Sequence, residues 1–219
     1  ARIDGSDAGS YAITQGTLSA GANYTVMFVA ANFTINKATL TVTADNLSRG
    51  YGSANPTFTA VISGFVHCDT LENSVAGAPD LTTTAGLTSP RGSYPIVVAL
   101  HTLASDNYTF SLVDGTLAVT KATLTVTADA QNKLYGAANP TPTATITGFL
   151  NTDTALTAVT GVPVLTHAAT LTSPVDTYAI TVAAGTLDAS NYDFTFVNGL
   201  LTVGKATLTV TADNKSKTY

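Results

Sequence analysis

The 219-residue sequence is 45% hydrophobic and only 11% charged, and it contains no Trp, one Met and one Cys. Thr occurs 41 times and Ala 33 times, against nine Lys plus Arg. This β-branched, lysine-poor composition argues against a helical bundle or a coiled coil. The net charge of -5 and the lack of a basic run exclude nucleic acid as a main ligand.

No stretch of the sequence predicts membrane insertion. The longest wholly apolar stretch, Val26 to Ala31, has six residues, whereas a membrane-spanning helix needs about 20. No signal peptide is predicted either. The single cysteine, Cys68, cannot form an internal disulfide, so we expect the fold to depend on packing.

An internal repeat organises the chain. The sequence Lys-Ala-Thr-Leu-Thr-Val-Thr-Ala-Asp begins at Lys37, Lys121 and Lys205, with a spacing of 84 residues both times. Residues 37–120 and 121–204 align without a gap and are identical at 45 of 84 positions. We therefore expect two complete repeats with one shared fold.

The flanking segments match parts of a repeat. Residues 1–36 align with the C-terminal part of a preceding repeat, and residues 205–219 align with the first strand of a following one. The sequence therefore begins and ends inside a repeat, and we expect it to be a segment of a longer array.

Alternating apolar and polar residues predict short strands along each repeat. Leu124, Val126 and Ala128 alternate with threonines and predict the first strand. The other strands of a repeat are expected, in the numbering of residues 37–120, over 57–65, 81–85, 94–103, 108–110 and 117–119. Asp114-Gly115, with Asn198-Gly199 at the matching place, predicts a hairpin with a type I′ turn.

These elements predict an all-β fold. Six or seven short strands without an amphipathic helix indicate a small antiparallel β-sandwich of the Ig-like kind, repeated end to end every 84 residues. A β-grasp-like repeat is the alternative.

The predicted boundary lies near Lys121. Leu117 and Val119 are odd-numbered, whereas Leu124 and Val126 are even-numbered. A strand cannot change its buried face without a bulge or a bend, so one repeat ends here and the next begins. No Gly, Pro or Ser linker lies at this point, and we expect repeats joined with little slack.

The sequence resembles a known family at a set of short motifs. They are Lys37 to Asp45, Tyr51-Gly52, Asn55-Pro56, Gly64-Phe65, Asp69-Thr70, Ser93-Tyr94, Asn107 to Phe110 and Gly115-Thr116-Leu117. Over essentially all 219 residues the sequence resembles the MBG domain family of the YGX type. The resemblance implies tandem, mostly β stalk modules of large, adhesin-like bacterial proteins that are secreted or attached to the cell surface. It supplies no shared catalytic residues and no fixed ligand.

Catalytic and zinc sites have little support in the sequence. His67-Cys68-Asp69 is the only place where a nucleophile, a base and an acid are adjacent, but the matching residues are Asn151-Thr152-Asp153. A surface loop is the better interpretation, because a nucleophile needs a convergent base and an orienting group. His67, His101 and His167 occupy different repeat positions, and no pair has the spacing of zinc ligands.

Three other side-chain sets leave alternatives open. Recurring carboxylate and amide side chains offer oxygens for calcium at a junction, but Asx turns and strand ends explain them better. These side chains belong to Asp45, Asp129, Asp213, the loop residues Asp69 and Asp153, and the clusters Asp106-Asn107 and Asn191-Tyr192-Asp193. Lys37, Lys121 and Lys205 are candidates for isopeptide bonds, or else mark the change of face. Tyr51, Tyr135, Tyr108 and Tyr192 would form a sugar-stacking platform or, more in keeping with their recurrence, core tyrosines.

The sequence thus predicts a structural stalk or filament segment of a long extracellular bacterial adhesin-like protein. We expect no catalytic, cofactor-binding or metal-binding residues. The expected partners are neighbouring repeats of the same chain, with host or cell-surface glycans as further candidates. A module whose repeats bind a glycan or glycoprotein multivalently is the alternative function.

Overall fold

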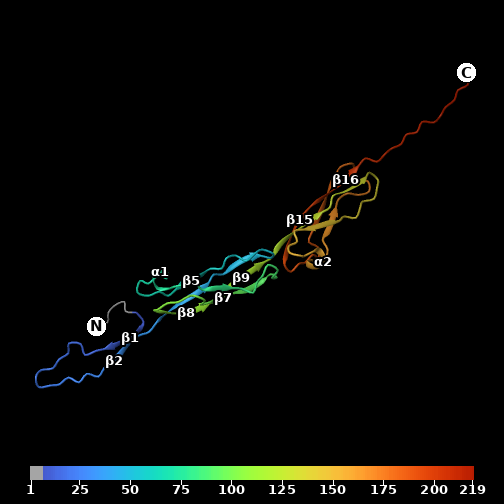
Figure 1. The fold of residues 1–219 in the computed structure, drawn as a ribbon. Helices are drawn as coiled ribbons and strands as arrows, with labels where there is room; N and C mark the ends of the chain where they lie inside the picture. The colour runs from blue at the N-terminus through green and yellow to red at the C-terminus, as the bar shows by residue number, and fades with distance from the viewer. Residues whose placement is uncertain (1–6) are drawn as a thin grey trace. The chain divides into compact units, whose positions relative to one another are not determined.

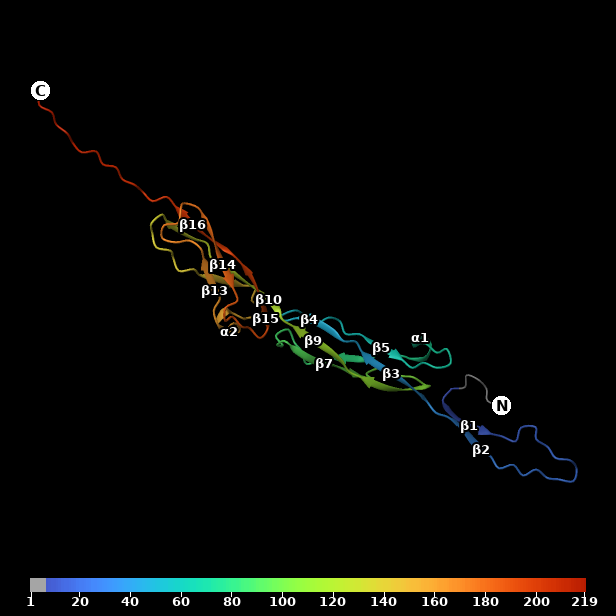
Figure 2. The same cartoon turned by 180° about the vertical axis from the view of Figure 1, so that it is seen from behind.

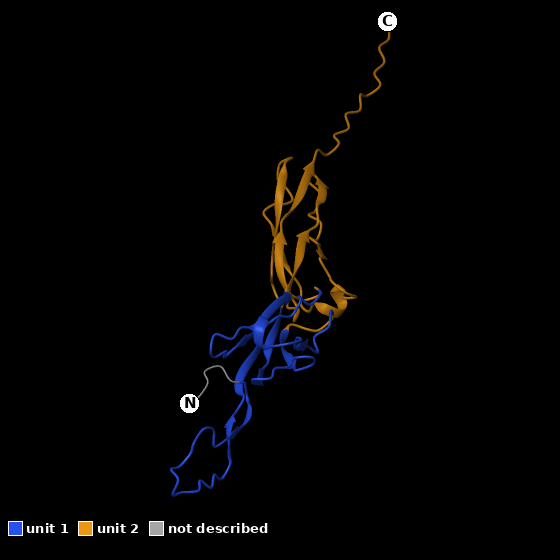
Figure 3. Ribbon diagram, turned by 60° about the vertical axis from the view of Figure 1, so that its left-hand side comes forward, with its two compact units in different colours: residues 1–49, 54–87, 92–119 blue, residues 50–53, 88–91, 120–219 orange. Residues whose placement is uncertain are grey.

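The computed structural model describes residues 7–219. The chain divides into two compact units (Figure 1, Figure 3). Unit 1 comprises residues up to Arg49 together with 54–87 and 92–119, and unit 2 comprises 50–53, 88–91 and 120–219. Unit 2 therefore includes two short segments that the 84-residue period assigns to the first complete repeat.

Fourteen of the strands lie in the two complete repeats, seven in each. In the first repeat they are β3 (Ala38–Ala44), β4 (Leu47–Gly50), β5 (Ala60–Ser63), β6 (Asp80–Thr82), β7 (Gly92–Ala99), β8 (Tyr108–Val113) and β9 (Gly115–Thr120). In the second they are β10 (Ala122–Ala128), β11 (Gln131–Leu134), β12 (Ala144–Thr147), β13 (Val164–His167), β14 (Thr177–Ala183), β15 (Tyr192–Val197) and β16 (Gly199–Gly204).

Each repeat folds into a three-stranded and a four-stranded sheet. The orders are β5-β3-β8 and β4-β9-β7-β6 in the first repeat, and β12-β10-β15 and β11-β16-β14-β13 in the second. The two sets of orders match strand for strand. The predicted all-β class and the shared fold of the two repeats are therefore confirmed.

Parallel strand pairs set these sheets apart from the purely antiparallel sandwich that the sequence predicts. β3 pairs with β8 in parallel, β10 pairs with β15 in parallel (Figure 2), and β11 pairs with β16 in parallel. The remaining pairs of β10 and β14 are antiparallel. The first strand of a repeat thus lies beside a strand near its end, so each three-stranded sheet forms only when both parts of the repeat are present.

The predicted hairpin at Asp114-Gly115 is wrong. β8 belongs to the three-stranded sheet and β9 to the four-stranded one, so the chain crosses between sheets at this dipeptide. A Cβ on Gly115 would lie 2.7 Å from the carbonyl oxygen of Ala44, and only glycine allows this close approach of two backbones. Asp114 Oδ1 accepts a hydrogen bond from the N–H of Val98 at 3.0 Å. The dipeptide therefore marks a crossing rather than a type I′ turn.

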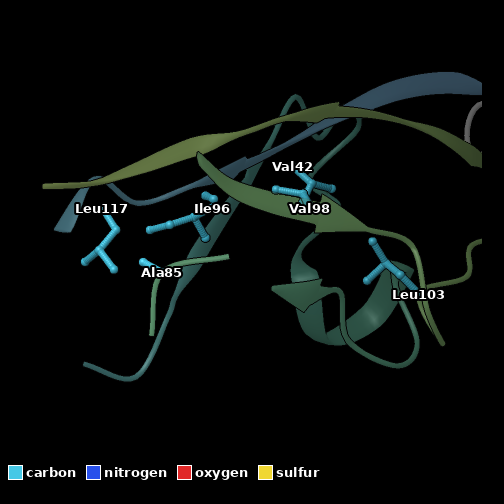
Figure 4. Packing of buried hydrophobic residues seen from close by; sticks show 7 residues of the cluster. Val42, Ala85, Ile96, Val98, Leu103 and Leu117 are labelled. Carbon is cyan, nitrogen blue, oxygen red and sulfur yellow. The ribbon is translucent and has the colours of Figure 1, made fainter. Parts of the chain in front are cut away.

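Alternating residues of both sheets build the core of each repeat. The unit 1 cluster contains Val42 of β3, Ile96 and Val98 of β7 and Leu117 of β9, all buried (Figure 4). The unit 2 cluster contains the matching set Val126, Ala128, Ala169, Ile180, Val182 and Leu201. The threonines between the buried residues of β10 are only partly buried, as period-two patterning requires.

The change of buried face near Lys121 is confirmed. Leu117 and Val119 are buried in β9, and Leu124 and Val126 are buried in β10. β9 ends at Thr120 and β10 begins at Ala122. One residue therefore separates the two strands, and the face changes across it.

A further strand pair precedes β3. β1 (Gly9–Ile13) pairs antiparallel with β2 (Ala31–Ile35), and Tyr11 lies opposite Phe33. β7 and β9 pair in the same way, with Tyr94 opposite Leu117. Residues near the N-terminus thus reproduce the pairing of the last part of a repeat.

Helices contribute little to the described chain. α1 (Leu71–Ser74) and α2 (Ala155–Ala158) have four residues each and contain no buried residue. No helix in residues 7–219 has the length and apolar character needed to cross a bilayer. A β-grasp arrangement, in which a helix packs across a sheet, is therefore not what these repeats adopt.

Candidate functional site

A buried tyrosine bound to an aspartate recurs in both units. Tyr108 donates its hydroxyl to Asp69 Oδ2 at 2.6 Å, and Tyr192 donates to Asp153 Oδ2 at 2.7 Å. Each tyrosine oxygen also accepts a backbone N–H at 3.0 Å, from Val66 in unit 1 and from Leu150 in unit 2. The tyrosine begins β8 or β15, and the aspartate lies in the loop before α1 or α2. We call each such set a tyrosine–aspartate socket.

Burial and hydrogen bonding keep these tyrosines protonated. Desolvation, followed by the hydrogen bond to Asp153, raises the pKa of Tyr192 to about 12. The same two causes raise the pKa of Tyr108 above its ordinary value. Because only the neutral phenol can donate to the carboxylate, protonation maintains the socket.

In unit 2 a second tyrosine enters the socket. Tyr51, in the segment 50–53 of this unit, donates its hydroxyl to Asp153 Oδ2 at 3.0 Å. Its ring meets the Tyr192 ring edge to face, with 5.4 Å between centroids and 82° between planes, a favoured aromatic geometry. Tyr51 is only 5% exposed. One carboxylate oxygen therefore receives two tyrosine hydroxyls.

Gly52 lets the chain approach this socket closely. Its φ is +76°, and a Cβ at this position would lie 2.7 Å from Leu150 Cδ1 and 2.9 Å from Leu150 Cβ. A side chain at residue 52 would therefore carry backbone strain and also collide with Leu150. The Tyr-Gly dipeptide supplies the inserted ring and the space beside it.

An asparagine before each socket tyrosine binds a second segment. Asn191 Oδ1 accepts the N–H of Arg91 at 2.9 Å within unit 2, and Asn107 Oδ1 accepts the N–H of Ala8 at 2.7 Å within unit 1. Ala8 and Arg91 both lie three residues before the tyrosine of a Ser-Tyr dipeptide. The same backbone contact is therefore made twice, by equivalent residues.

Tyr135-Gly136 has the same sequence and a different environment. The backbone matches closely: φ is +78° at Gly136, and the N–H of Tyr135 donates to Gly204 O at 2.8 Å, as Tyr51 does to Thr120 O. Yet Tyr135 is 49% exposed, and a Cβ on Gly136 would meet nothing within 4 Å. Within the described chain, this dipeptide is formed but not inserted in a socket.

Each repeat also buries one cation, which the sequence reasoning missed. Arg49 and Lys133, each 7% exposed, occupy the same repeat position. Arg49 Nε donates to Asn55 Oδ1 at 2.7 Å. Lys133 Nζ instead donates to the carbonyl oxygen of Thr170 at 2.6 Å, and no group in residues 7–219 donates to the buried Asn139 Oδ1. The sequence signal that could have predicted these buried cations is the basic residue that recurs six positions before Asn-Pro in both repeats.

The structure separates the four tyrosines considered for sugar stacking. Tyr51, Tyr108 and Tyr192 are buried, so their interpretation as core tyrosines is confirmed. Their faces are not open to a sugar ring. Tyr135 alone of the four exposes about half of its surface.

The residues His67-Cys68-Asp69 do not converge on a catalytic arrangement. His67 and Cys68 have positive φ values of 56° and 66°, and the Cys68 side chain is exposed. Asp69 is hydrogen-bonded to Tyr108 rather than to His67. The matching Asn151 also has a positive φ, of 55°. This segment is a tight surface turn in both repeats.

The histidines and aspartates considered as metal ligands lie apart. No group of three or more His, Cys, Asp or Glu side chains within residues 7–219 has a geometry that would hold a metal ion. Asp129 Oδ1 accepts the Thr145 hydroxyl at 2.7 Å, and hydrogen bonds from Thr143 and Thr145 lower its pKa. Asp45 accepts the Thr59 hydroxyl in the same way. Just after β3 and β10, these aspartates thus bind threonines at or next to the start of β5 and β12.

The recurring lysines make ordinary polar contacts. Lys121 Nζ lies 3.4 Å from the exposed carboxylate of Asp193, and Lys37 Nζ donates to Ser105 O at 2.9 Å. Lys205 is exposed. An ion pair at the surface and a backbone acceptor lend no support to isopeptide bonds at these positions.

A polar hollow of about 460 Å³ lies in unit 1. Its lining includes Asp7, Glu72, Asn73, Ser105, Asp106 and Asn107. No aromatic side chain among residues 7–219 lines it, although sugar-binding sites commonly offer a ring face for stacking. The hollow is therefore a weaker glycan candidate than its polar side chains suggest.

Comparison with known proteins identifies the repeats. The family model described as MBG domain (YGX type) matches residues 1–34, 40–118 and 124–202. Neither the comparison with curated proteins nor that with solved structures found a match. The three matched ranges follow the 84-residue period and contain both sockets.

Proposed function

The chain belongs to the MBG domain family of the YGX type, and we propose that it serves as a structural spacer in a long extracellular stalk or filament. Its role in this proposal is to hold other parts of a surface protein at a distance, without catalysis. The bacterial cell surface is the proposed location.

The observation that carries this proposal is the repetition of one fold without a linker. The two repeats have matching sheet orders, and a single residue separates β9 from β10. Unit 2 also includes residues 50–53 and 88–91, which belong to the first repeat in sequence. This arrangement suits a spacer, because residues of one repeat complete the unit that the next repeat forms and only Lys121 lies between β9 and β10.

The variation between the repeats also favours a spacer. Residues 66–80 and 150–164 include the loops that differ most in sequence, and their side chains are largely exposed. The core positions and the sockets, by contrast, match. A shared ligand would need a shared surface, whereas a spacer needs only a shared fold.

Single-molecule pulling on the full chain tests the proposal. Each repeat should unfold in a separate event with a contour increment of 84 residues at about 3.4 Å each, or about 29 nm, less its folded length. Two equal events are expected. A smooth extension without force peaks, or one event that releases both repeats, would contradict a spacer built of separate modules.

Multivalent glycan binding is the second candidate, and the polar hollow in unit 1 is the observation that favours it. Titration of the full chain against a glycan array should show no selective binding if the spacer proposal holds. Selective binding that is lost in Glu72→Gln, but kept in Asp188→Asn as a surface control in unit 2, would favour the second candidate instead.

A further inference from the structure

We propose that Tyr135 and Gly136 form a docking surface for the tyrosine–aspartate socket of a further repeat of this type. The inference rests on the proposed function as a tandem array, and it names the residues through which one module binds the next. Its partner is a repeat that follows Gly204, where Lys205 to Asp213 restates the first strand of a repeat.

The docking element is already formed in the described chain. Gly52 and Gly136 have φ values of +76° and +78°. The N–H groups of Tyr51 and Tyr135 donate to equivalent carbonyls, each at 2.8 Å. The turn therefore has the same backbone whether or not its tyrosine is inserted, and docking would need no refolding of this segment.

This turn exposes apolar surface. The adjacent residues Leu134 and Tyr135 are 54% and 49% exposed, so two large apolar side chains next to each other in the sequence contact water. In unit 2, inserting the equivalent Tyr51 leaves 5% of its surface exposed. The same insertion would remove about the same ring surface of Tyr135 from water, which is favourable.

The chemistry of the socket defines the partner. The socket needs a carboxylate oxygen that accepts two hydroxyls, a buried tyrosine that presents its ring, and an aliphatic side chain that tolerates only glycine beside it. In unit 2 these are Asp153, Tyr192 and Leu150. Unit 1 holds the same types in Asp69, Tyr108 and Val66. The partner is therefore another repeat with this socket rather than an unrelated protein.

An extended chain tests this inference. A copy of residues 121–204, in which the counterpart of Tyr135 is replaced by Phe, is inserted between Gly204 and Lys205 of the full chain. Tyrosines are nitrated with tetranitromethane and mapped by mass spectrometry, and the replacement gives the peptide of the copy a different mass from the peptide that contains Tyr135. In the unextended chain Tyr135 should react at least about tenfold faster than Tyr51, because Tyr51 reacts only after local opening. In the extended chain Tyr135 should slow about tenfold, to the rate of Tyr51.

Matched variants of the extended chain identify the contact. Replacing the inserted copy's counterpart of Asp153 by Ala should restore fast nitration of Tyr135, whereas Asp69→Ala, in a socket that Tyr135 does not reach, should not. Gly136→Ala should also restore fast nitration, because its Cβ would collide with the copied leucine.

Two outcomes would overturn the inference. The first is that Tyr135 is nitrated as fast in the extended chain as in the unextended one. The second is that Tyr135 is nitrated as slowly as Tyr51 in the unextended chain. Either can occur while pulling still gives two separate unfolding events. Failure of the docking surface is therefore distinguishable from failure of the spacer function.

Discussion

Tyr51-Gly52 and Tyr135-Gly136 share their sequence and their backbone conformation, but they differ in what surrounds them. Tyr51 is buried against Tyr192 and Asp153 within unit 2, whereas Tyr135 exposes half of its surface. Gly52 leaves no room for a methyl group, and Gly136 leaves ample room. The comparison shows that the dipeptide determines its own turn, while its burial depends on a socket supplied by another part of the chain.

The buried cations provide a second comparison. Arg49 satisfies Asn55 Oδ1, and Lys133, with a single nitrogen at its tip, binds backbone carbonyls instead and leaves Asn139 Oδ1 without a donor in the described chain. The buried cation therefore satisfies the asparagine oxygen in the first repeat but not in the second. Substitutions at matched positions can test both comparisons.

Truncating the two tyrosines should give the largest difference. Tyr51→Ala removes a buried ring and should lower the free energy of unfolding of unit 2 by about 3 kcal/mol. Tyr135→Ala removes a half-exposed ring and should change it by no more than about 0.5 kcal/mol. Urea denaturation of both variants measures the two values. Equal losses would mean that Tyr51 is not buried as the structure has it.

Replacing Gly52 and Gly136 by alanine should distinguish the cost of backbone strain at positive φ from the cost of a steric clash with Leu150. Gly136→Ala should cost about 1 kcal/mol, because alanine is unfavourable at positive φ. Gly52→Ala should cost the same strain plus about 1 to 2 kcal/mol for displacing Leu150. The two variants are compared by urea denaturation in the same buffer. A Gly52→Ala chain as stable as the Gly136→Ala chain would contradict the close packing at Leu150.

Exchanging the cations should sharpen the second comparison. Lys133→Arg supplies a donor for Asn139 Oδ1 and should stabilise unit 2 by about 1 kcal/mol. Arg49→Lys removes the donor for Asn55 and should destabilise unit 1 by about 1 to 2 kcal/mol. Thermal unfolding followed by calorimetry resolves the two directions. Destabilisation by Lys133→Arg would show that the site has no room for the guanidinium group.

A further expected effect is a loss of stability at alkaline pH. The pKa of Tyr192 is raised to about 12 in the folded chain, above the ordinary value of about 10. Its stabilising contribution is therefore complete below about pH 10 and is lost as the pH rises through about 12. Tyr192→Phe should flatten this part of the pH profile of unit 2. An equally steep profile in the variant would assign the effect to other groups.

The sequence predicted the repeat and six of the seven strands in each repeat, because these depend on local or periodic information. It missed β4 and β11, which are short and carry no clear alternation. The alternation of Leu124, Val126 and Ala128 places their side chains on one face regardless of the partner strand. The change of face at Lys121 follows from the same counting. These features could be read without knowing which strands pair.

Pairing and insertion could not be read in this way. Asp114-Gly115 has the composition of a hairpin turn, but the glycine is needed because the Ala44 backbone passes close to it, from 71 positions earlier. Tyr51 and Tyr135 look alike in sequence, and only the position of a distant socket distinguishes them. Long-range approach of backbones leaves no periodic signal.

The most direct test of the account is a double-mutant cycle between Tyr51 and Asp153. Tyr51→Phe, Asp153→Ala and the double variant are compared by urea denaturation of the full chain, and Tyr135→Phe replaces Tyr51→Phe in a parallel cycle. Because Tyr51 donates directly to Asp153, we expect a coupling energy of about 1 kcal/mol in the first cycle. The second should give a coupling of about zero, since separated sites are additive. Additivity in both cycles would contradict the insertion of Tyr51 into the socket.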